Sequence, residues 1–503
     1  MSTTPRRIRP EHVEPVPLSS LVADAPGVAV TGVTLDSRSV QPGDLYVGLP
    51  GAATHGARFA GQAVAAGAVA VLTDPEGAPL AEGCGVPVLT VADPRADLAR
   101  VAAQAYGQPA ERMTMFGVTG TTGKTSTTFL LASALGAAGR RVGTIGTLGF
   151  RLDSEVLASS RTTVTTPEAP DLQALLAYFA ERGADAVAME VSSHALALHR
   201  TDGVVFDVAG FTNLGRDHLD FHHSVEEYFQ AKARLFRDGH SRTAAIGIDD
   251  DFGRRLAAEV TASGGTVVTT GSAPEADYRI VETEALADGG SRLVLATPSG
   301  PREFTIGLLG AFNARNAATA VAMLDLAGLD LDTAIRGLAA ATVPGRMQLV
   351  DLGAGAPRAV VDFAHTPESV AAALAALPQG RRIAVLGCGG DRDQAKRGPM
   401  GAAAATNADV VVVTDDNPRS EEPADIRAAV LAGARGAASG STRVVDGGDR
   451  ADAIELALRI ADPADWVAVL GKGHETGQQL ADRTIPFDDA VELTRAWARL
   501  KDV

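Results

Sequence analysis

Glycine and threonine alternate before a lysine in the segment TGTTGKT, residues 119–125, and this composition is typical of a loop that holds phosphate groups. Backbone N–H groups in such a loop, with the N-terminus of the next helix, bind phosphate oxygens. Lys124 would reach the β- and γ-phosphates of ATP, and the Thr125 hydroxyl would bind Mg²⁺. The strict GxxxxGK[ST] spacing is not met, because Val118 stands at its first glycine. The alternative is a plain glycine turn, which the Lys-Thr ending disfavours.

Acidic and basic side chains that suit metal-assisted phosphate chemistry follow downstream. Glu190 ends the apolar run ADAVAME, and a carboxylate there suits Mg²⁺, which prefers oxygen ligands. His218 stands between Asp217 and Asp220. A hydrogen-bonded loop histidine is the plainer interpretation, and zinc is disfavoured because no Cys pair or HxxxH spacing accompanies it. Lys232 lies in the amphipathic segment SVEEYFQAKARLF, where a lysine most often faces solvent.

Three loops in the last third of the chain, GCGGDRDQ, TDDNPR and LGKGHE, each follow a strand-like run. Their side chains are expected at one edge of a parallel sheet, beyond the carboxyl ends of its strands. Arg392 and Arg419 would form a clamp for a carboxylate, and Glu475 would bind an ammonium group. Together they suit an amino acid with a second zwitterionic head group. Taken alone, DDNPR is also a plain turn, because Asn-Pro favours one.

The elements that must position these residues form three successive patterns. Residues 18–110 mix short strand-like runs with alanine-rich helical runs. Residues 111–344 alternate apolar runs with amphipathic helices, which predicts a parallel sheet covered on both faces, with an antiparallel hairpin within 278–306. Residues 345–503 repeat the alternation as a doubly wound pattern. We therefore expect an α/β protein of three domains, preceded by a loose tail at residues 1–17.

Composition and charge disfavour several classes of protein. The 503 residues suggest about three domains at roughly 150 residues each. A net charge of -16 argues against a uniformly basic nucleic-acid-binding protein. The only cysteines, Cys84 and Cys388, provide no disulfide framework, so a cytoplasmic location is expected. The N-terminus has no apolar signal-peptide core, and no stretch of about 18 apolar residues predicts a membrane span.

Several of these segments resemble the Mur ligases and the related folylpolyglutamate synthases. TGTTGKT resembles the TGTNGKT loop of that family, with Thr122 in place of the usual Asn. YFQAK resembles its YxxAK segment, LLGAFNARN its GxFNxxN segment, and DNPR the motif of members that add diaminopimelate. These motifs follow the family's order from about residue 27 to residue 490. Gly247 and Leu198 depart from the pattern, because many relatives have Asn at the first position and some have Gln at the second.

The resemblance implies a central ATP-binding domain at residues 111–344. Its catalytic residues would be Lys124, Lys232 and His218, with Lys232 carbamylated, a modification that burial would favour because it needs a neutral amine. Two Mg²⁺ ions are implied, with ligands from Thr125, Glu190, His218 and the carbamylated Lys232. The residues implied to bind ATP are Gly117, Val118, Thr119, Gly120, Thr121, Thr122, Gly123, Lys124, Thr125, Asn313, Arg346, Asp362 and His365.

Two further sites are implied by the resemblance. A UDP-linked acceptor would bind mainly to the domain at residues 18–110, through Leu35, Ser37, Ala52, Ala53, Thr54, Thr165, Thr166, Ser192 and Arg200. Diaminopimelate would bind to the Rossmann-like domain at residues 345–503, through Arg392, Asp416, Asn417, Pro418, Arg419, Gly471 and Glu475. Without the resemblance, Thr165 and Thr166 would be assigned as caps of the helix at Pro167.

The implied activity is an ATP-dependent ligation that joins diaminopimelate to the D-Glu carboxylate of UDP-N-acetylmuramoyl-L-Ala-D-Glu through an acyl phosphate. Its partners would be these small molecules alone, without nucleic acid or a membrane, and the chain is expected to be a monomer. One alternative is a lysine-adding ligase of the same family, against which DNPR argues. The other is a nucleotide-sensing protein of the same fold without turnover, against which Lys124, Glu190, His218 and Lys232 argue together.

Overall fold

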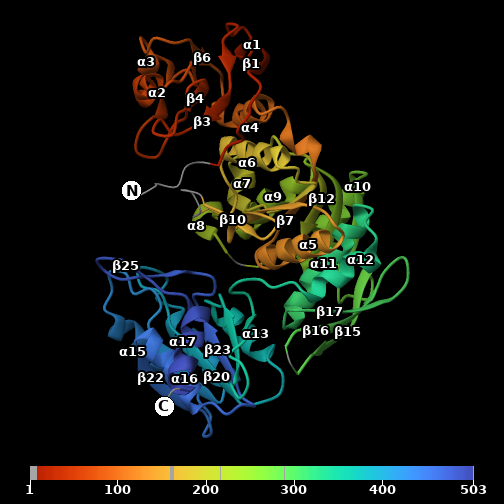
Figure 1. Ribbon diagram of the computed structural model, residues 1–503, viewed down its shortest axis with the longest axis vertical. Helices are drawn as coiled ribbons and strands as arrows, with labels where there is room; N and C mark the ends of the chain where they lie inside the picture. The colour runs from red at the N-terminus through yellow and green to blue at the C-terminus, as the bar shows by residue number, and fades with distance from the viewer. Residues whose placement is uncertain (1–7, 159–163, 216, 288, 502–503) are drawn as a thin grey trace. The chain divides into compact units, whose positions relative to one another are not determined.

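The computed structural model describes residues 8–158, 164–215, 217–287 and 289–501, and the chain forms two compact units (Figure 1). Unit 1 consists of residues 1–281, 295–302 and 315–338, and unit 2 of residues 282–294, 303–314 and 339–503. Unit 1 contains a four-stranded sheet and most of a larger sheet, and unit 2 contains a six-stranded sheet.

The first sheet of unit 1 is small and entirely parallel, in the order β3-β4-β5-β6. Leu45 and Leu72 from its strands share a core with Leu98 and Ala102 of α4. The strands are β1 (Val16–Pro17), β2 (Ala29–Val30), β3 (Gly32–Thr34), β4 (Asp44–Gly48), β5 (Ala70–Thr73) and β6 (Val88–Thr90), of which β1 and β2 pair separately. The helices are α1 (Leu18–Leu21), η1 (Gly56–Phe59), α2 (Ala60–Ala65), α3 (Ala78–Ala81) and α4 (Pro94–Ala105).

Residues 8–17 are held against unit 1, so the loose tail predicted for residues 1–17 is wrong for this part. Arg9 donates two hydrogen bonds to Asp44, at 2.7 and 2.8 Å. Two backbone N–H groups of the segment donate to Glu181 at 2.8 Å each. These partners are far away along the chain, so local composition could not reveal them. The first seven residues of the predicted tail lie outside the described residues.

The larger sheet has the order β10-β9-β8-β11-β7-β12-β13-β14, followed by β15, β16 and β17. Strands β8, β11, β7, β12, β13 and β14 are parallel, whereas β9 and β10 pair antiparallel. The bounds are β7 (Thr114–Thr119), β8 (Val142–Gly146), β9 (Gly149–Leu152), β10 (Glu155–Leu157), β11 (Ala186–Glu190), β12 (Phe206–Phe211), β13 (Ser241–Gly247), β14 (Thr266–Gly271), β15 (Tyr278–Ala285), β16 (Ser291–Ala296) and β17 (Arg302–Ile306).

Strand β7 lies at the centre of this sheet, between β11 and β12, and is apolar because it is covered on both faces. In open parallel sheets, ligands bind beyond the carboxyl ends of such central strands. The loop that follows β7 therefore lies where a ligand site is expected. The helices of this region are η2 (Pro109–Arg112), α5 (Lys124–Ala137), α6 (Ala169–Glu181), α7 (Ser193–Ala197), α8 (Leu219–His222), α9 (Val225–Ala233), η3 (Arg234–Phe236), α10 (Asp251–Ala262), α11 (Ala311–Leu326) and α12 (Leu331–Ala339).

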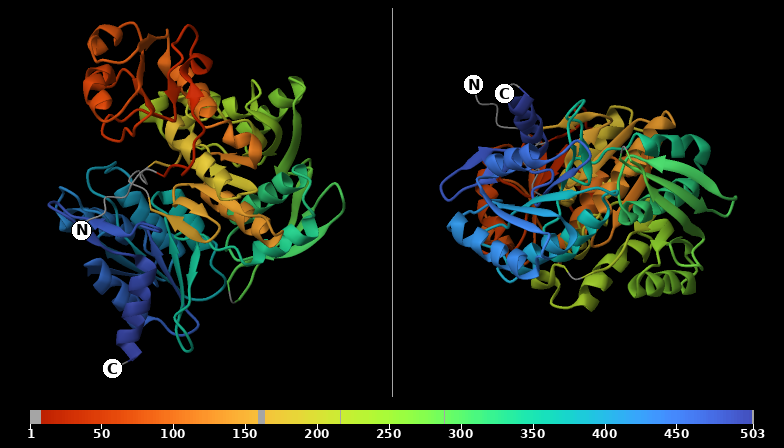
Figure 2. Two further views of the ribbon diagram at one scale, coloured as in Figure 1. Left: turned by 45° about the horizontal axis from the view of Figure 1, so that its top comes forward. Right: turned by 90° about the horizontal axis from the view of Figure 1, so that it is seen from below.

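The sheet of unit 2 has the order β18-β19-β23-β20-β21-β22 and is parallel except for the edge strand β18. Helices lie on both faces of this sheet (Figure 2). Successive residues of its strands enter two different cores, since Val360 packs with α13, α14 and α15, and Val361 with α16 and α17. The elements are β18 (Gln348–Val350), β19 (Arg358–Asp362), α13 (Pro367–Ala375), β20 (Arg382–Leu386), α14 (Arg397–Asn407), β21 (Val410–Thr414), α15 (Pro423–Ala437), β22 (Arg443–Gly448), α16 (Arg450–Ile460), β23 (Trp466–Leu470), β24 (Gly477–Gln479), β25 (Thr484–Pro486) and α17 (Asp489–Lys501).

These sheets confirm the predicted α/β class with parallel central strands. Consecutive strands β15, β16 and β17 are neighbours in the sheet, and their connections are too short for parallel crossovers, in agreement with the hairpin predicted within residues 278–306. Over the part of the chain that the structure describes, no helix has both the length and the apolar character needed to cross a membrane.

Candidate active site

The loop between β7 and α5 is shaped by two glycines with positive φ, 151° at Gly120 and 87° at Gly123. A Cβ at Gly120 would lie 2.0 Å from Thr212 Oγ1, and one at Gly123 would lie 2.3 Å from Asn316 Oδ1. Neither position accepts a side chain in this arrangement. Helix α5 begins at Lys124, and no described side chain caps its N-terminus. Its first N–H groups thus suit an anionic ligand such as a phosphate.

Lys124 and Asn213 hold this loop in its present shape. Lys124 Nζ donates to the backbone oxygens of Gly120 and Thr121, at 2.8 and 3.0 Å. Asn213 Oδ1 accepts from the N–H of Thr122 at 3.1 Å, and Asn213 Nδ2 donates to the oxygen of the same residue at 3.2 Å. Thr122, which replaces the usual Asn, is therefore hydrogen-bonded at both its backbone N–H and its backbone oxygen. A bound phosphate would compete with two carbonyl oxygens for the lysine ammonium group.

Glu190, at the end of β11, lies against the start of α5. It is 1% exposed and is paired in register with Val118 of β7. Thr125 Oγ1 donates to Glu190 Oε1 at 3.0 Å. Thr147 donates its N–H to the same oxygen at 2.8 Å and its hydroxyl to Oε2 at 3.2 Å. This approach requires a glycine at position 146, because a Cβ on Gly146 would lie 2.2 Å from Glu190 Oε1.

Two threonines predicted to hold the acceptor are connected to Glu190, one directly and one through Thr147. Thr165 Oγ1 lies 3.1 Å from Thr147 Oγ1. Thr166 Oγ1 donates to the backbone oxygen of Glu190 at 2.9 Å and accepts from the N–H of Ser192 at 3.0 Å. The predicted phosphate and acceptor residues of unit 1 therefore meet at Glu190.

Lys232, in α9, is 1% exposed beneath the phosphate loop, so the alternative of a solvated lysine is wrong. Its Nζ donates to Gly120 O at 2.8 Å and lies 4.4 Å from the centroid of the Tyr228 ring. Burial lowers the pKa of Lys232 well below its ordinary value, and the charge of Lys124 lowers it further. A lowered pKa favours the neutral amine, which is the form that reacts with carbon dioxide.

His218 precedes α8 with φ 53° and is exposed. Its ring centroid is 4.8 Å from that of His194 and 6.1 Å from that of Tyr228. Partial desolvation lowers the pKa of His218, with Asp217 acting in the opposite direction and nearby lysines adding to the decrease. The imidazole is therefore biased towards the neutral form that binds metal ions.

The donor set of unit 1 fits the requirements of Mg²⁺. Thr125 Oγ1 and Glu190 Oε1 are two oxygen donors 3.0 Å apart, at the helix end that suits phosphate. Mg²⁺ is commonly bound by one or two protein oxygens, with waters and substrate phosphates completing its octahedral shell. Among the described residues, no group of three or more His, Cys, Asp or Glu side chains forms a cluster that could hold a metal.

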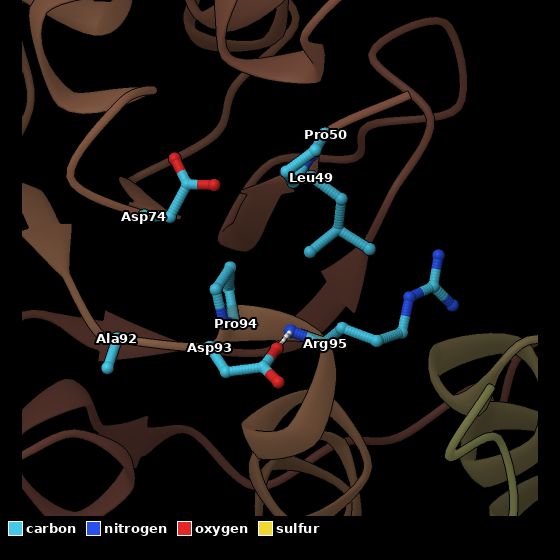
Figure 3. A pocket seen from close by; sticks show the side chains of 7 residues that line it. All are labelled: Leu49, Pro50, Asp74, Ala92, Asp93, Pro94 and Arg95. Carbon is cyan, nitrogen blue, oxygen red and sulfur yellow. Dashed lines mark hydrogen bonds between the residues drawn. The ribbon is translucent and has the colours of Figure 1, made fainter. Parts of the chain in front are cut away.

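The residues predicted to hold uridine lie on loops of the first sheet. Leu35 and Ser37 follow β3, and residues 52–54, Ala-Ala-Thr, follow β4. Ser37 Oγ donates to Gln62 Oε1 at 3.1 Å. The same domain contains a pocket of about 360 Å³, shown in Figure 3, and none of the five predicted residues lines it. Its lining consists of Leu49, Pro50, Asp74, Ala92, Asp93, Pro94 and Arg95.

An ion-pair chain leads from Arg95 of this pocket to the acceptor threonines. Arg95 Nη1 and Arg200 Nη2 bind the two oxygens of Glu168, at 2.7 and 2.8 Å. Arg200 Nη1 also donates to Thr166 O at 3.1 Å. Glu168 is the N-cap residue of α6, so neither Thr165 nor Thr166 has the capping role that sequence alone suggested. Arg200 thus joins the acceptor threonines to the first domain, within unit 1.

In unit 2, residues predicted to contact the nucleotide surround Phe363. The Arg346 guanidinium lies 4.4 Å from the Phe363 ring centroid, and His365 Nδ1 lies 2.8 Å from Phe363 O. Asp362, at the end of β19, accepts two backbone N–H groups at 2.7 and 2.8 Å. Burial raises the pKa of Asp362, with Arg346 and these hydrogen bonds acting in the opposite direction.

Asn313 and Gly471 have contacts within unit 2 that fix their local backbone. Asn313 is buried, and its Nδ2 donates to Leu309 O at 2.9 Å. Gly471 has φ 113°, and its N–H donates to Asp362 O at 3.0 Å. A Cβ on Gly471 would lie 2.9 Å from Asp416 Oδ2. Gly471 thus connects the predicted nucleotide contact Asp362 with the first residue of DNPR.

The DNPR segment follows β21 and contacts two other loops at the same edge of the sheet. Arg419, with φ 52°, donates from Nη1 to Gly390 O at 2.6 Å and from Nε to Gln479 Oε1 at 2.8 Å. Asn417 Nδ2 donates to Glu475 Oε2 at 2.8 Å. The three loops predicted to share this edge therefore do meet there.

The other residues predicted for the amino-acid site surround these. A Cβ at Gly389 would lie 3.0 Å from Arg419 Nη1 and 3.9 Å from Arg392 Cγ, so the two arginines flank one glycine. Arg392 is exposed, whereas Asp416 and Pro418 are buried. Burial raises the pKa of Asp416, and the neighbouring Arg450 opposes that shift. The arrangement thus combines the exposed Arg392, the half-buried Arg419 and the buried Asp416.

Sequence reasoning missed four residues that the structure places in these contacts. Thr147 donates a hydrogen bond to Glu190, and Asn213 accepts one from Thr122 of the phosphate loop. Lys472 and Gln479 contact the DNPR segment. Only Lys472 had a visible signal, because it lies within the LGKGHE loop that was already singled out.

His474 should make the stability of unit 2 sensitive to acid. Its ring packs on Phe363 with centroids 5.1 Å apart, and its Nδ1 is buried without a hydrogen-bond partner among the described residues. Burial, then the charge of Arg346, lowers the pKa of His474 to about 4 from 6.5, with Glu475 opposing. The unfolded chain therefore binds this proton more tightly. The free energy of unfolding should fall between pH 6.5 and pH 4, by up to about 3 kcal/mol.

Urea unfolding at a series of pH values measures this dependence. The variant His474→Phe keeps a ring against Phe363 but does not titrate. Its free energy of unfolding should fall less steeply over the same pH interval than that of the unchanged protein. Equal slopes for the two proteins would contradict the assignment.

Three family models match the chain in succession. The model described as "Mur ligase family, catalytic domain" covers residues 29–106, "Mur ligase middle domain" covers residues 118–324, and "Mur ligase, glutamate ligase domain" covers residues 345–473. Together they include the phosphate loop, Glu190, Lys232 and the DNPR segment.

Known proteins resemble the chain over nearly its whole length. A relative from Streptomyces coelicolor, named UDP-N-acetylmuramoyl-L-alanyl-D-glutamate–2,6-diaminopimelate ligase, is 48% identical, with 98% of this chain and 99% of the relative covered. A solved structure of a ligase with the same name superposes with a TM-score of 0.72 at 30% identity, over 97% of this chain and 100% of the other. A MurF ligase from Thermotoga maritima in complex with ADP shares the fold, with a TM-score of 0.62 at 18% identity over 94% and 99% of the two chains.

Proposed function

This chain belongs to the Mur ligase family, and we propose that it joins diaminopimelate to the D-Glu carboxylate of UDP-N-acetylmuramoyl-L-Ala-D-Glu at the expense of ATP. The observation that carries this proposal is the 48% identity over nearly the full length to a relative named for that ligation. The DNPR segment, in contact with Glu475, supports the choice of amino acid.

A carboxylate and an amine do not condense in water without activation, so ATP would first phosphorylate the D-Glu carboxylate. The γ-phosphoryl group passes to a carboxylate oxygen, and ADP leaves. The α5 N-terminus and Lys124 would hold the phosphates during this transfer. Thr165, Thr166 and Arg200 would hold the acceptor, because hydrogen bonds connect their polar groups to one another and to Glu190. The amine then attacks the acyl carbon, phosphate leaves, and an amide remains after proton loss.

Thr125 and Glu190 would hold one Mg²⁺, and His218 with carbamylated Lys232 would hold a second. When bound, these ions would neutralise the charge that develops on the phosphoryl oxygens and the acceptor carboxylate. Burial of Lys232 under the loop supports the carbamate, since it lowers the pKa of the lysine and so favours the neutral amine.

We assign the acceptor nucleotide to residues 18–110, ATP to residues 111–344 and the amino acid to residues 345–503. In the last of these, Arg419 and Arg392 would clamp the second carboxylate of diaminopimelate, and Glu475 would bind its second ammonium group. A monomer in the cytoplasm, where ATP is available, completes the proposal. The two cysteines are free thiols, which suits that location.

An amino-acid panel tests the function directly. The purified protein, ATP, Mg²⁺ and the UDP-muramyl dipeptide are mixed with diaminopimelate, lysine or no amino acid, and phosphate release is measured. Release with diaminopimelate alone is expected. Release with lysine instead would establish the lysine-adding alternative, and no release with any amino acid would favour a nucleotide-sensing protein.

Arg419→Ala should raise the KM for diaminopimelate about 30-fold or more, because a hydrogen-bonded charge pair with the substrate is lost. The KM for ATP should change by less than about threefold. Steady-state phosphate release with each substrate varied in turn measures both constants. Arg495→Ala removes an arginine with a 69% exposed side chain from α17 and is the matched control. An unchanged KM for diaminopimelate in Arg419→Ala would refute the assigned clamp.

A further inference from the structure

Glu475 and Arg419, the two charged contacts assigned to diaminopimelate, are each fixed by a neighbouring side chain with no assigned role. We propose that Lys472 and Gln479 are positioning residues that orient Glu475 and Arg419 for the second zwitterionic head group of the substrate. This inference rests on the proposed function, since it concerns the specificity of the same site. Neither side chain is proposed to touch the substrate.

Lys472 is fully buried directly after β23, and each of its three ammonium hydrogens has an acceptor within reach. Its Nζ lies 3.1 Å from Asn417 Oδ1, 3.2 Å from Glu475 Oε2 and 2.6 Å from Gly477 O. A buried ammonium group is stable only when it is paired and hydrogen-bonded in this way. The contacts join DNPR, the LGKGHE loop and the start of β24 at one atom.

These contacts hold one oxygen of the Glu475 carboxylate and leave the other available to a ligand. Oε2 accepts from both Lys472 Nζ and Asn417 Nδ2, at 3.2 and 2.8 Å. Oε1 has no hydrogen-bond partner among the described residues, and the side chain is 36% exposed. An ammonium group of the substrate would therefore meet Oε1, whose orientation is set by the two bonds to Oε2.

Asn417, which is itself assigned to diaminopimelate binding, also connects the two positioning residues. Its Oδ1 accepts from Lys472 Nζ at 3.1 Å and from the Gln479 N–H at 2.9 Å, so both lone pairs are used. Its Nδ2 donates to Glu475. The DNPR asparagine thus serves as a bridge between Lys472, Gln479 and Glu475.

Gln479, at the end of β24, fixes Arg419 in a comparable way. Its backbone oxygen accepts from the Arg419 N–H at 3.0 Å, and its side-chain Oε1 accepts from Arg419 Nε at 2.8 Å. Gly390 O accepts from Arg419 Nη1 at 2.6 Å. These bonds use donors of Nε and Nη1, and Nη2 has no hydrogen-bond partner among the described residues, so its donors are available for a carboxylate.

Fixed charges at two points favour a substrate that has complementary charges at the same separation. Diaminopimelate has a carboxylate and an ammonium group at its far end, whereas lysine has an ammonium group alone. If Glu475 and Arg419 were free to move, diaminopimelate would lose part of its advantage, because ordering long side chains on binding costs free energy. Lys472 and Gln479 therefore determine specificity indirectly.

Two variants test this, both measured by phosphate release with the UDP-muramyl dipeptide. Gln479→Leu changes an exposed side chain and should fold normally, and Lys472→Met removes the buried charge at nearly constant length. Each should raise the KM for diaminopimelate about tenfold, the size expected when a hydrogen bond to a charged group is lost. The KM for ATP and kcat should stay within about threefold. Lys501→Met, on the exposed face of α17, is the matched control for loss of a lysine charge.

Double variants separate positioning from a general structural effect. If Lys472 acts through Glu475, adding Lys472→Met to Glu475→Gln should change the KM for diaminopimelate by less than about threefold. Gln479→Leu added to Arg419→Ala should behave likewise. Additive changes, or equal rises in the KM for ATP, would overturn the inference. If Lys472→Met does not fold, the comparison of Gln479→Leu alone and in combination with Arg419→Ala tests the inference.

The outcome is distinguishable from a failure of the proposed function. If the unchanged protein uses lysine rather than diaminopimelate, the proposed function fails before any variant is made. If it uses diaminopimelate and Gln479→Leu leaves its KM unchanged, only the positioning role is lost.

Discussion

Replacing Lys124 by Met should lower kcat for phosphate release at least about a thousandfold. Its ammonium group donates to two backbone oxygens of the phosphate loop, at 2.8 and 3.0 Å. A bound nucleotide would draw it to the phosphates, where it would stabilise charge as the γ-phosphoryl group transfers. Methionine has similar length but offers neither charge nor a donor. Steady-state phosphate release, with all three substrates saturating, measures the loss.

Thr122→Asn is the matched control for Lys124→Met in the same loop. It restores the residue usual in the family, and Asn213 binds the Thr122 backbone, which the substitution leaves in place. Turnover should remain within about threefold, as expected of a conservative change at an exposed position. A Lys124→Met protein that keeps more than a tenth of normal turnover would contradict the assigned role.

Lys232→Ala should also remove most turnover, by about a hundredfold or more. A buried side chain under Gly120 would be lost together with the carbamate carboxylate proposed to bind Mg²⁺. Loss of the carbamate alone should affect kcat more than the KM for ATP, because the loop, Lys124 and α5 remain. Steady-state kinetics at saturating Mg²⁺ measures both, and unaltered turnover would remove Lys232 from the mechanism.

The modification itself has a readout that does not depend on activity. Protein equilibrated with ¹³C-bicarbonate should show one carbamate carbon resonance, which Lys232→Ala lacks and Lys124→Met retains. The resonance should weaken as pH falls, since protonation removes the neutral amine that reacts. A resonance that persists in Lys232→Ala would place the carbamate elsewhere.

The phosphate loop and the three loops of unit 2 could be predicted because each depends on local signals. Gly120 and Gly123 mark a turn, Lys124 and Thr125 open a helix, and the apolar run before them is a strand. Parallel strands then bring their carboxyl ends to one edge without further information. These features follow from residue types within about ten positions of one another.

Other parts of the site depend on contacts that no local pattern contains. Thr147 binds Glu190 only because β8 and β11 pair in one register and residue 146 has no side chain. Lys472 looked like a charged loop residue, but tertiary packing buries it against Asn417, 55 positions away. The predicted tail failed for the same reason, since Arg9 finds its partner 35 positions away.

Glu190 gives the two halves of the site in unit 1 a common element. One face of this residue contacts Thr125 at the phosphate loop, and its backbone contacts Thr166 among the acceptor residues. A nucleotide that shifts Glu190 would alter its contact with Thr166, and an acceptor that shifts Glu190 would alter its contact with Thr125. Nucleotide and acceptor are then thermodynamically linked, and reciprocity requires that each change the affinity of the other by the same factor. An inhibitor built for one half would therefore gain or lose potency with the occupancy of the other.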